Sequence, residues 1–237
     1  MTLVTATVSQ AGSPEKSGRR PVPQLVTVRN ALISVFDKDG LSDLLALLSS
    51  RGVTIWSTGG TFREIESLQK RFDYRLEAIS DLTGYPEMPG GLVKTLHPKI
   101  HAGILAEPYK EDQDAYLDEI GAVPFDLVVC NLYPFERISK VPDVSFETLR
   151  QTIDIGGPTM LRAAAKNFLR VATVVDPADY AKLAADFERH GGATSLDTRW
   201  QLAKKAFDHV RHYDDAISLT LESLDPGKLA DAYQVIG

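Results

Sequence analysis

The chain has 237 residues, of which 26 are basic and 32 acidic, and its formal net charge is -6. This acidic balance argues against a nucleic-acid-binding protein, which needs a basic face, and no run approaches the roughly 18 apolar residues of a membrane span. Cys130 is the single cysteine, so it can form neither an internal disulfide nor a thiolate zinc site by itself. We therefore expect a globular protein of the reducing cytoplasm that binds neither nucleic acid nor membrane.

The N-terminal residues 1–24 are rich in Ser, Thr, Gly and Pro and contain no aromatic residue, which is typical of a mobile tail. They do not look like a signal peptide, because threonines interrupt the apolar stretch and the basic pair comes late. We predict one domain over residues 25–225, followed by the start of a linker at 226–237.

Short apolar runs with many β-branched residues alternate with helical patterns along the chain. This alternation indicates a parallel sheet, and nearly continuous apolar strands are typical of a sheet covered on both faces. We therefore expect an α/β fold of three layers, with a mostly parallel central sheet and the longest helix packed across its outside. The predicted strands are 31–36, 53–57, 125–130 and 171–175, and the predicted helices are 41–52, a segment from 61, 111–120, 145–153, 158–168, 177–189 and 194–223.

The segment from Thr83 to Leu105 breaks this pattern because it carries four glycines and three prolines. We predict an irregular loop, and a loop this long inside a compact domain is more often functional than idle. A surface loop without function is the alternative. His97 and His101 lie four residues apart in it, but no HExxH motif or suitably spaced carboxylate accompanies them, so we expect no metal site.

Two turns with glycines and hydroxyls follow the first two predicted strands. Both would leave the carboxyl edge of a parallel sheet, where ligands bind, and helix N-termini at that edge favour an anion. The turns predict a monophosphate site, although Ser, Thr and Gly before a helix are also ordinary capping residues. The candidate residues are Ser34 and Lys38 at the first turn, and Ser57, Thr58, Gly59, Gly60 and Thr61 at the second.

A third loop begins at Asp154 and opens the predicted helix 158–168, with Pro158 suited to the first helical position. Asp154 could cap this helix or act as a base, and its spacing does not decide between the two. Lys166 could point into a cleft because three alanines precede it, although it shares one helix face with Arg162, and two such cations are usually a solvated surface.

Asn131 and Tyr133 directly follow the third predicted strand, so their polar groups would reach the same edge of the sheet. The alternative for Tyr133 is a half-buried aromatic ring with a solvated hydroxyl.

Five motifs then occur in one order: SVFDKDGL (34–41), STGGT (57–61), VKTLHPKIHAGIL (93–105), CNLYPF (130–135) and DIGGPTMLRAAAKN (154–167). Together they closely resemble the inosine monophosphate (IMP) cyclohydrolase domain of a bifunctional purine-biosynthesis family, over most of residues 28–220. In that family the domain is joined to an AICAR transformylase domain and forms a homodimer. The resemblance implies a fold similar to that of methylglyoxal synthase.

The resemblance also implies a reaction. The substrate would be 5-formamidoimidazole-4-carboxamide ribotide (FAICAR), whose carboxamide nitrogen attacks its own formyl carbon; loss of water then gives IMP, the last step of de novo purine biosynthesis. This ring closure is intramolecular and needs no organic cofactor. Most of its catalysis would come from orientation and from stabilisation of the developing oxyanion. Transformylase activity is not expected from this chain.

Carried onto matching positions, the resemblance implies a catalytic group. Asp154 would orient the carboxamide and help to remove its proton, and Lys166 and Tyr133 would face the formyl oxygen. Lys94 would tune the charge of Asp154 or share the acid–base chemistry. The implied substrate contacts are the phosphate-turn residues Ser34, Lys38, Ser57, Thr58, Gly59, Gly60 and Thr61, together with Thr95, Asn131, Ile155, Gly156 and Gly157.

One position departs from the family pattern, because Leu92 stands where many members have an arginine.

Two alternatives to the cyclohydrolase remain: an elimination of phosphate from a triose phosphate, as in methylglyoxal synthase, and a nucleotide sensor without catalysis. A sensor has no need for the complete acid–base set, which argues against it.

Overall fold

The computed structural model describes residues 21–86, 88, 92–225, 227, 229, 232–234 and 236. Its centre is a five-stranded parallel sheet with the strand order β4-β3-β2-β5-β6. This arrangement confirms the predicted α/β fold with a parallel sheet. The strands are β2 (Asn30–Val35), β3 (Thr54–Ser57), β4 (Leu76–Ala78), β5 (Leu127–Asn131) and β6 (Ala172–Val174).

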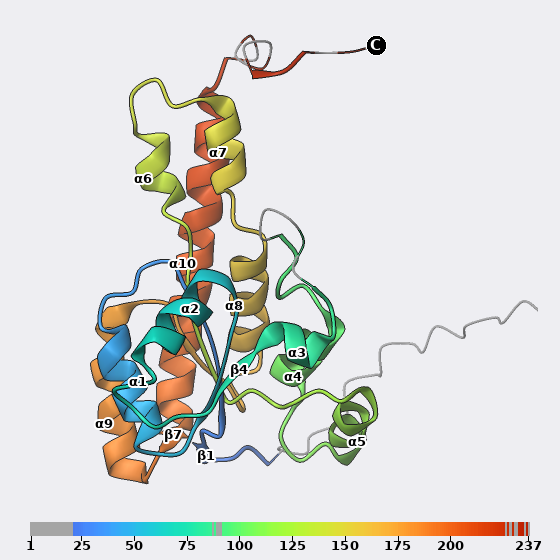
Figure 1. Ribbon diagram of the computed structural model, residues 1–237, viewed down its shortest axis with the longest axis vertical. Helices are drawn as coiled ribbons and strands as arrows, with labels where there is room; N and C mark the ends of the chain where they lie inside the picture. The colour runs from blue at the N-terminus through green and yellow to red at the C-terminus, as the bar shows by residue number, and fades with distance from the viewer. Residues whose placement is uncertain are drawn as a thin grey trace, which may run out of the picture.

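Helices cover both faces of this sheet, as Figure 1 shows. Successive residues of one strand point to opposite faces, so Leu32 belongs to one apolar cluster and Ile33 to the other. This is why the strands read as continuous apolar runs. The cluster around Leu32 includes residues of α4 (Pro98–Leu105), α8 (Gly156–Lys166) and α10 (Leu196–Ser223), and the cluster around Ile33 includes residues of α1 (Leu41–Ser49), α2 (Gly59–Leu68) and α9 (Tyr180–His190).

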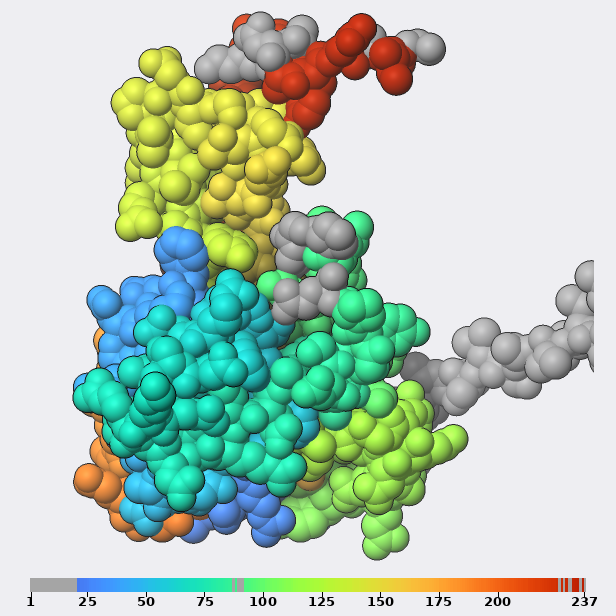
Figure 2. Space-filling view, viewed as in Figure 1, coloured from blue at the N-terminus to red at the C-terminus, as the bar shows by residue number. Residues whose placement is uncertain are grey.

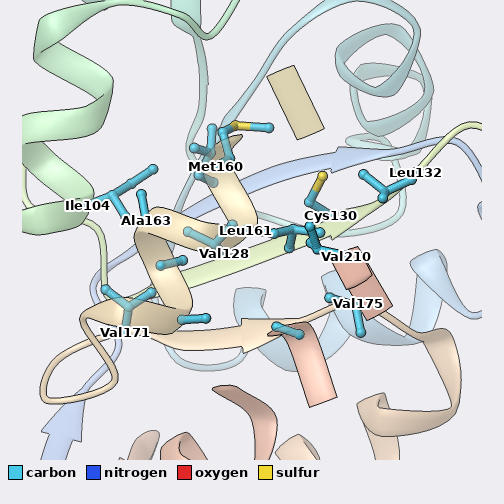
Figure 3. Packing of buried hydrophobic residues seen from close by; sticks show 14 of the residues in the cluster. Ile104, Val128, Cys130, Leu132, Met160, Leu161, Ala163, Val171, Val175 and Val210 are labelled. Atoms are coloured by element: carbon cyan, nitrogen blue, oxygen red, sulfur yellow. The ribbon is translucent and has the colours of Figure 1, made fainter. Parts of the chain in front are cut away.

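Figure 3 shows how α8 meets the sheet: Met160, Leu161 and Ala163 lie over the strand that carries Val128 and Cys130. These side chains are nearly or fully buried. The small residues in the middle of α8 allow this close approach, and the packing fixes the N-terminus of α8 at the carboxyl end of β5.

The prediction of an irregular loop from Thr83 to Leu105 is wrong in its second half, where α4 forms. His97 caps this helix by accepting a hydrogen bond from the Lys99 N–H at 3.2 Å, and Pro98 occupies its first turn. Gly103 lies where the segment that leads into β5 packs directly against α4. Its carbonyl accepts a hydrogen bond from the Phe125 N–H at 2.9 Å, and a Cβ at this position would contact the Phe125 ring. Pro98 and Gly103 therefore serve a capped and tightly packed helix rather than a loop.

Several short elements were not predicted. They are the edge strand β4 of the central sheet, β1 (Leu25–Thr27), β7 (Ala193–Ser195), α3 (Ile79–Thr83), α6 (Phe135–Ser139) and the 3-10 turn η1 (Pro177–Asp179). The helices α5 (Glu111–Ile120) and α7 (Phe146–Thr152) match predicted helices.

The predicted tail 1–24 is bound to the domain at its end. The fully buried Arg199 donates to the carbonyl oxygens of Pro23, Thr194 and Phe168, and Leu196 N–H donates to Gln24 O. Directly after these residues β1 pairs antiparallel with β7. The ordered domain therefore extends at least to Pro23, and residues 1–20 lie outside the described part of the chain.

The long helix α10 has two environments. Its first half packs on β6 and α8, as expected, and its second half leaves the sheet and packs with α6 and α7. Figure 2 shows α6 and α7, in yellow, standing above the blue-to-teal body. Within the segment predicted as a linker, the Tyr233 ring lies 6.0 Å from that of Phe146, and its hydroxyl bonds to Glu147 of α7. Among the described residues, none of the helices has the length and apolar character needed to cross a membrane.

Candidate active site

A cavity of about 400 Å³ opens at the carboxyl ends of β2, β3 and β5. The chain first runs outward from β2 through β3 to β4 and then returns to β5 on the other side of β2. Ligands bind at such a switch point in parallel sheets. The residues predicted from the sequence that line the cavity are Ser34, Lys38, Thr58, Gly59, Gly60, Thr61, Lys94, Thr95, Asn131, Tyr133, Asp154, Ile155, Gly156 and Gly157.

One wall of the cavity is the first turn of α2. The buried Thr61 hydroxyl accepts from the Val35 N–H at 3.0 Å and donates to the Val35 carbonyl at 2.9 Å. Its hydroxyl thus joins α2 to the end of β2 and is engaged within the fold. The N-terminus of α2, with its backbone N–H groups and helix dipole, is thereby fixed at the cavity.

Asn131 holds the neighbouring loop. Its side-chain oxygen accepts from the N–H groups of Phe36 and Asp37 at 2.7 and 2.9 Å, and its NH2 group donates to the Asp37 carbonyl at 2.9 Å. The same loop carries Lys38, which lines the cavity. Asn131 therefore sets the position of the loop, and its amide is engaged there rather than directed to a ligand.

Lys94 lies against the glycine turn of the α2 wall. A Cβ added to Gly59 would be 2.5 Å from Lys94 Nζ, and Gly59 has a φ of +57°. Only glycine satisfies both the conformation and the contact. The preceding Val93 also has a positive φ, of 61°, which costs a β-branched residue about 1–3 kcal/mol and occurs mostly at functional sites.

Asp154 lines the cavity at the N-terminus of α8. Its Oδ1 accepts the Gly157 N–H at 2.8 Å. Burial raises the pKa of this carboxyl, while hydrogen bonds from the Gly157 and Gly156 backbones partly oppose the shift. Gly157 has no room for a side chain, because a Cβ would lie 2.5 Å from both Asp154 Oδ2 and Leu132 Cδ2.

Tyr133 lies at the rim of the cavity and is 51% exposed. Its ring packs edge-to-face against that of Phe36, with centroids 5.5 Å apart. The contact with Phe36 therefore positions the Tyr133 ring, and the exposed side of the residue leaves the hydroxyl accessible to a ligand.

Two predicted site residues are not in the cavity lining. Ser57 is fully buried and donates its hydroxyl to the Ile33 carbonyl at 2.7 Å. Lys166 is the last residue of α8, ten residues after Gly156, which places it about 15 Å farther along the helix axis. The structure therefore does not bring Lys166 to Asp154, and the expected approach of Lys166 into this cleft is wrong.

The remaining polar groups near the cavity serve the fold. Burial lowers the pKa of His101, and burial together with the Asp154 carboxylate raises the pKa of the Cys130 thiol. A buried, protonated thiol fits the packing role expected for Cys130. The described residues contain no group of three or more His, Cys, Asp or Glu side chains that could hold a metal ion.

The sequence reasoning missed the apolar part of the lining and Gln151. Most of these residues are next to predicted site residues in the chain. Their position in the sequence could therefore have identified them as part of the lining. They are Val35, Phe36, Val93, Leu96, Gln151, Ile153 and Met160. Leu92, the departure from the family pattern, also lines the cavity and is 59% exposed.

Two family models match the chain. The model described as an MGS-like domain matches residues 40–159, and the one described as the AICARFT/IMPCHase bienzyme matches residues 164–235. The cavity lining falls almost wholly within the first match.

Known proteins agree with these matches. The chain is 46% identical over 198 residues to the bifunctional purine biosynthesis protein PurH of Brucella ovis and to that of Brucella abortus, which covers 84% of this chain and 36% of each relative. It thus spans about a third of the length of these relatives. The crystal structure of ForH superimposes with a TM-score of 0.70 at 34% identity, covering 82% of this chain and all of that one.

Proposed function

Because the chain belongs to the MGS-like domain family and its residues 164–235 match the model of the AICARFT/IMPCHase bienzyme, we propose that it is an IMP cyclohydrolase that closes the ring of FAICAR to IMP. The observation that carries this proposal is the presence of a half-buried lysine and a half-buried carboxylate, Lys94 and Asp154, in the lining of one cavity. The relatives are described as bifunctional and are more than twice as long, so the proposal covers the cyclohydrolase step alone.

The α2 wall would bind the substrate phosphate. Thr58, Gly59 and Gly60 belong to the helix N-terminus, and Lys38 adds a positive charge from the neighbouring loop. Helix N-termini and lysines are the usual recognition elements for a phosphate monoester. Since the phosphate is remote from the reacting atoms, these contacts fix the position of the substrate without entering the chemistry.

Ring closure would then take place beside Asp154. The carboxamide nitrogen forms a bond to the formyl carbon, and its N–H proton passes to the Asp154 carboxylate. The formyl oxygen becomes an alkoxide and takes a proton from Lys94 or Tyr133 to form a hydroxyl. This hydroxyl leaves as water with the proton that Asp154 returns, while the N–H proton of the former formamide nitrogen passes back to Lys94 or Tyr133 and the ring C=N bond forms. Holding the two reacting groups in contact contributes more to the rate than any single proton transfer. Both groups belong to one bound molecule, so the enzyme only has to fix their orientation.

Lys94 and Tyr133 would serve the formyl oxygen. Lys94 offers a cation and Tyr133 a hydroxyl donor, and both line the cavity with Asp154. Stabilisation of a developing oxyanion by such donors contributes about 3–4 kcal/mol per donor. Lys166 has no part in this proposal because it does not line the cavity.

The MGS-like match favours one alternative, the elimination of phosphate from a triose phosphate. Such a substrate has three carbons and a phosphate, whereas a cavity of about 400 Å³ lined as far as Ile153 and Met160 suits a larger, partly apolar ligand. This volume supports a nucleotide over a triose phosphate.

The decisive experiment is an absorbance assay of the purified chain with FAICAR. Formation of IMP supports the proposal, and Asp154→Ala should lower the rate by about 10²–10⁴-fold while the protein stays folded. A folded wild-type protein that binds IMP without forming it is a sensor, and one that releases methylglyoxal from dihydroxyacetone phosphate is the alternative enzyme. Either result overturns the proposal.

Two further properties come with the family resemblance. We propose that the protein acts as a homodimer and in the cytoplasm, where its free thiol, Cys130, stays reduced. Sedimentation equilibrium of the purified chain tests the first, and a monomer at all concentrations would refute it.

A further inference from the structure

Tyr213 lies on α10, outside the segment that matches the MGS-like domain, yet its hydroxyl reaches the cavity wall. Tyr213 does not line the cavity itself. Its ring is 9% exposed and packs edge-to-face on Phe135, with centroids 6.3 Å apart. Tyr213 therefore connects the long helix to a position two residues after Tyr133.

The hydroxyl of Tyr213 is bound to the loop that carries Asp154. The Asp154 N–H donates to Tyr213 Oη at 2.7 Å, and the hydroxyl donates in turn to the Thr152 carbonyl at a longer 3.3 Å. It thus bridges the backbone on both sides of Ile153. Burial raises the pKa of Tyr213 to about 12, so the hydroxyl keeps its proton at neutral pH and can make both bonds.

Asp154 is consequently held at two points. Its backbone N–H is held by Tyr213, and its carboxylate is held by the Gly157 N–H at 2.8 Å. One anchor alone leaves rotation about the bonds between backbone and carboxylate, whereas two anchors fix the direction of the side chain. The second anchor comes from the first turn of α8 and the first from α10, so the carboxylate is set by how these two helices pack.

We propose that Tyr213 is a positioning residue for Asp154, which it aims at the substrate through the backbone of residues 152–154. The proposal rests on the proposed function, because Asp154 matters for turnover only if it takes part in ring closure. It also gives α10 a role in the cavity, although the MGS-like match ends at residue 159.

The test is Tyr213→Phe, which keeps the ring against Phe135 and removes only the hydroxyl. We expect kcat for FAICAR to fall by about tenfold to a hundredfold, as a misplacement of about 1 Å does. The KM should change little, because the phosphate wall is built from α2 and the β2–α1 loop. The acid limb of the kcat profile should also move, since the surroundings of the Asp154 carboxylate change.

Tyr74→Phe is the matched control. Tyr74 is 8% exposed and donates its hydroxyl to the Ile65 carbonyl, so the variant also loses one buried hydrogen bond. It should lose similar folding stability and keep the wild-type kcat and pH profile. An equal fall in kcat in both variants, or a Tyr213→Phe enzyme with wild-type kcat and pH profile, overturns the proposal.

Hydrogen exchange separates this proposal from the proposed function. The Asp154 amide should exchange at least tenfold faster in Tyr213→Phe than in the wild type, whether or not the protein turns over FAICAR. A wild-type protein without turnover refutes the cyclohydrolase assignment. Unchanged exchange at Asp154 refutes the positioning role by itself.

Discussion

Replacing Gly157 by alanine tests the geometry of the Asp154 wall most directly. The new Cβ would lie 2.5 Å from Asp154 Oδ2 and 2.5 Å from Leu132 Cδ2, about 1 Å closer than ordinary contact between heavy atoms. Leu132 is 8% exposed and belongs to the apolar cluster under α8, so it has little room to move. The contact with Leu132 therefore costs overpacking energy, and the contact with Oδ2 is relieved only when the Asp154 carboxylate shifts.

The expected magnitude follows from this displacement. A carboxylate shifted by about 1 Å loses the good geometry of its 2.8 Å bond to the Gly157 N–H, and such a shift costs about 10²-fold in rate. The fold should survive, because alanine gains about 1 kcal/mol of helix propensity while overpacking costs about 1–3 kcal/mol. We therefore expect kcat for FAICAR to fall about a hundredfold in a folded protein.

The assay is the steady-state absorbance of IMP formation, with circular dichroism to verify folding. Gly156→Ala is the milder comparison, because its Cβ would meet only the Thr95 hydroxyl at 3.0 Å, and that side chain can rotate. A Gly157→Ala enzyme with near-normal kcat would refute the reasoning, as would a larger loss for Gly156→Ala than for Gly157→Ala.

Three other predictions follow from the same contacts. Asp154 must be ionised to accept a proton, and burial raises its pKa. We therefore expect kcat to fall as the pH decreases, with a midpoint above about 4, the ordinary carboxyl pKa. A kcat that stays constant down to about pH 4 would contradict this prediction. Lys38→Ala should raise KM by about ten- to hundredfold with little change in kcat, because a phosphate contact stabilises substrate and transition state equally; a fall in kcat alone would place Lys38 in the chemistry. Arg199→Met should lower the free energy of unfolding by about 3 kcal/mol in urea titrations, because three backbone carbonyls lose their donor; a change below about 1 kcal/mol would mean that water replaces the guanidinium.

Local sequence patterns were sufficient for four of the five strands of the central sheet and for most of its helices, but not for the short edge strand β4. Runs such as 125–130 must be strands buried on both sides, because residues of both parities are apolar, and β5 places them in that way. The turns after β2 and β3 were also identified from local sequence, since glycine and hydroxyl residues between a strand and a helix suit helix capping or anion binding. Ser57 shows where local patterns fail. It lies at the end of β3, but its hydroxyl donates to the Ile33 carbonyl instead of facing the cavity.

The sequence also contained two signals that composition obscured. His97 and Pro98 are a helix start, but the surrounding glycines and prolines favoured a loop. The 11 residues from Gly156 to Lys166 make about three turns of helix. This length separates Lys166 from the N-terminus of α8, whichever face of the helix Lys166 lies on.

By itself, the sequence determined the parallel α/β sheet, the turns that would bind an anion, and the membership of Lys94, Tyr133 and Asp154 in one set of motifs. Only the tertiary structure decided which polar groups remain available to a ligand. Asn131 and Thr61 are engaged by β2 and the loop after it, and Tyr213 holds Asp154 from 59 residues away. Each of these bonds joins segments distant in the chain. Local propensity and spacing carry no information about such partners, because the packing of whole helices on the sheet selects them.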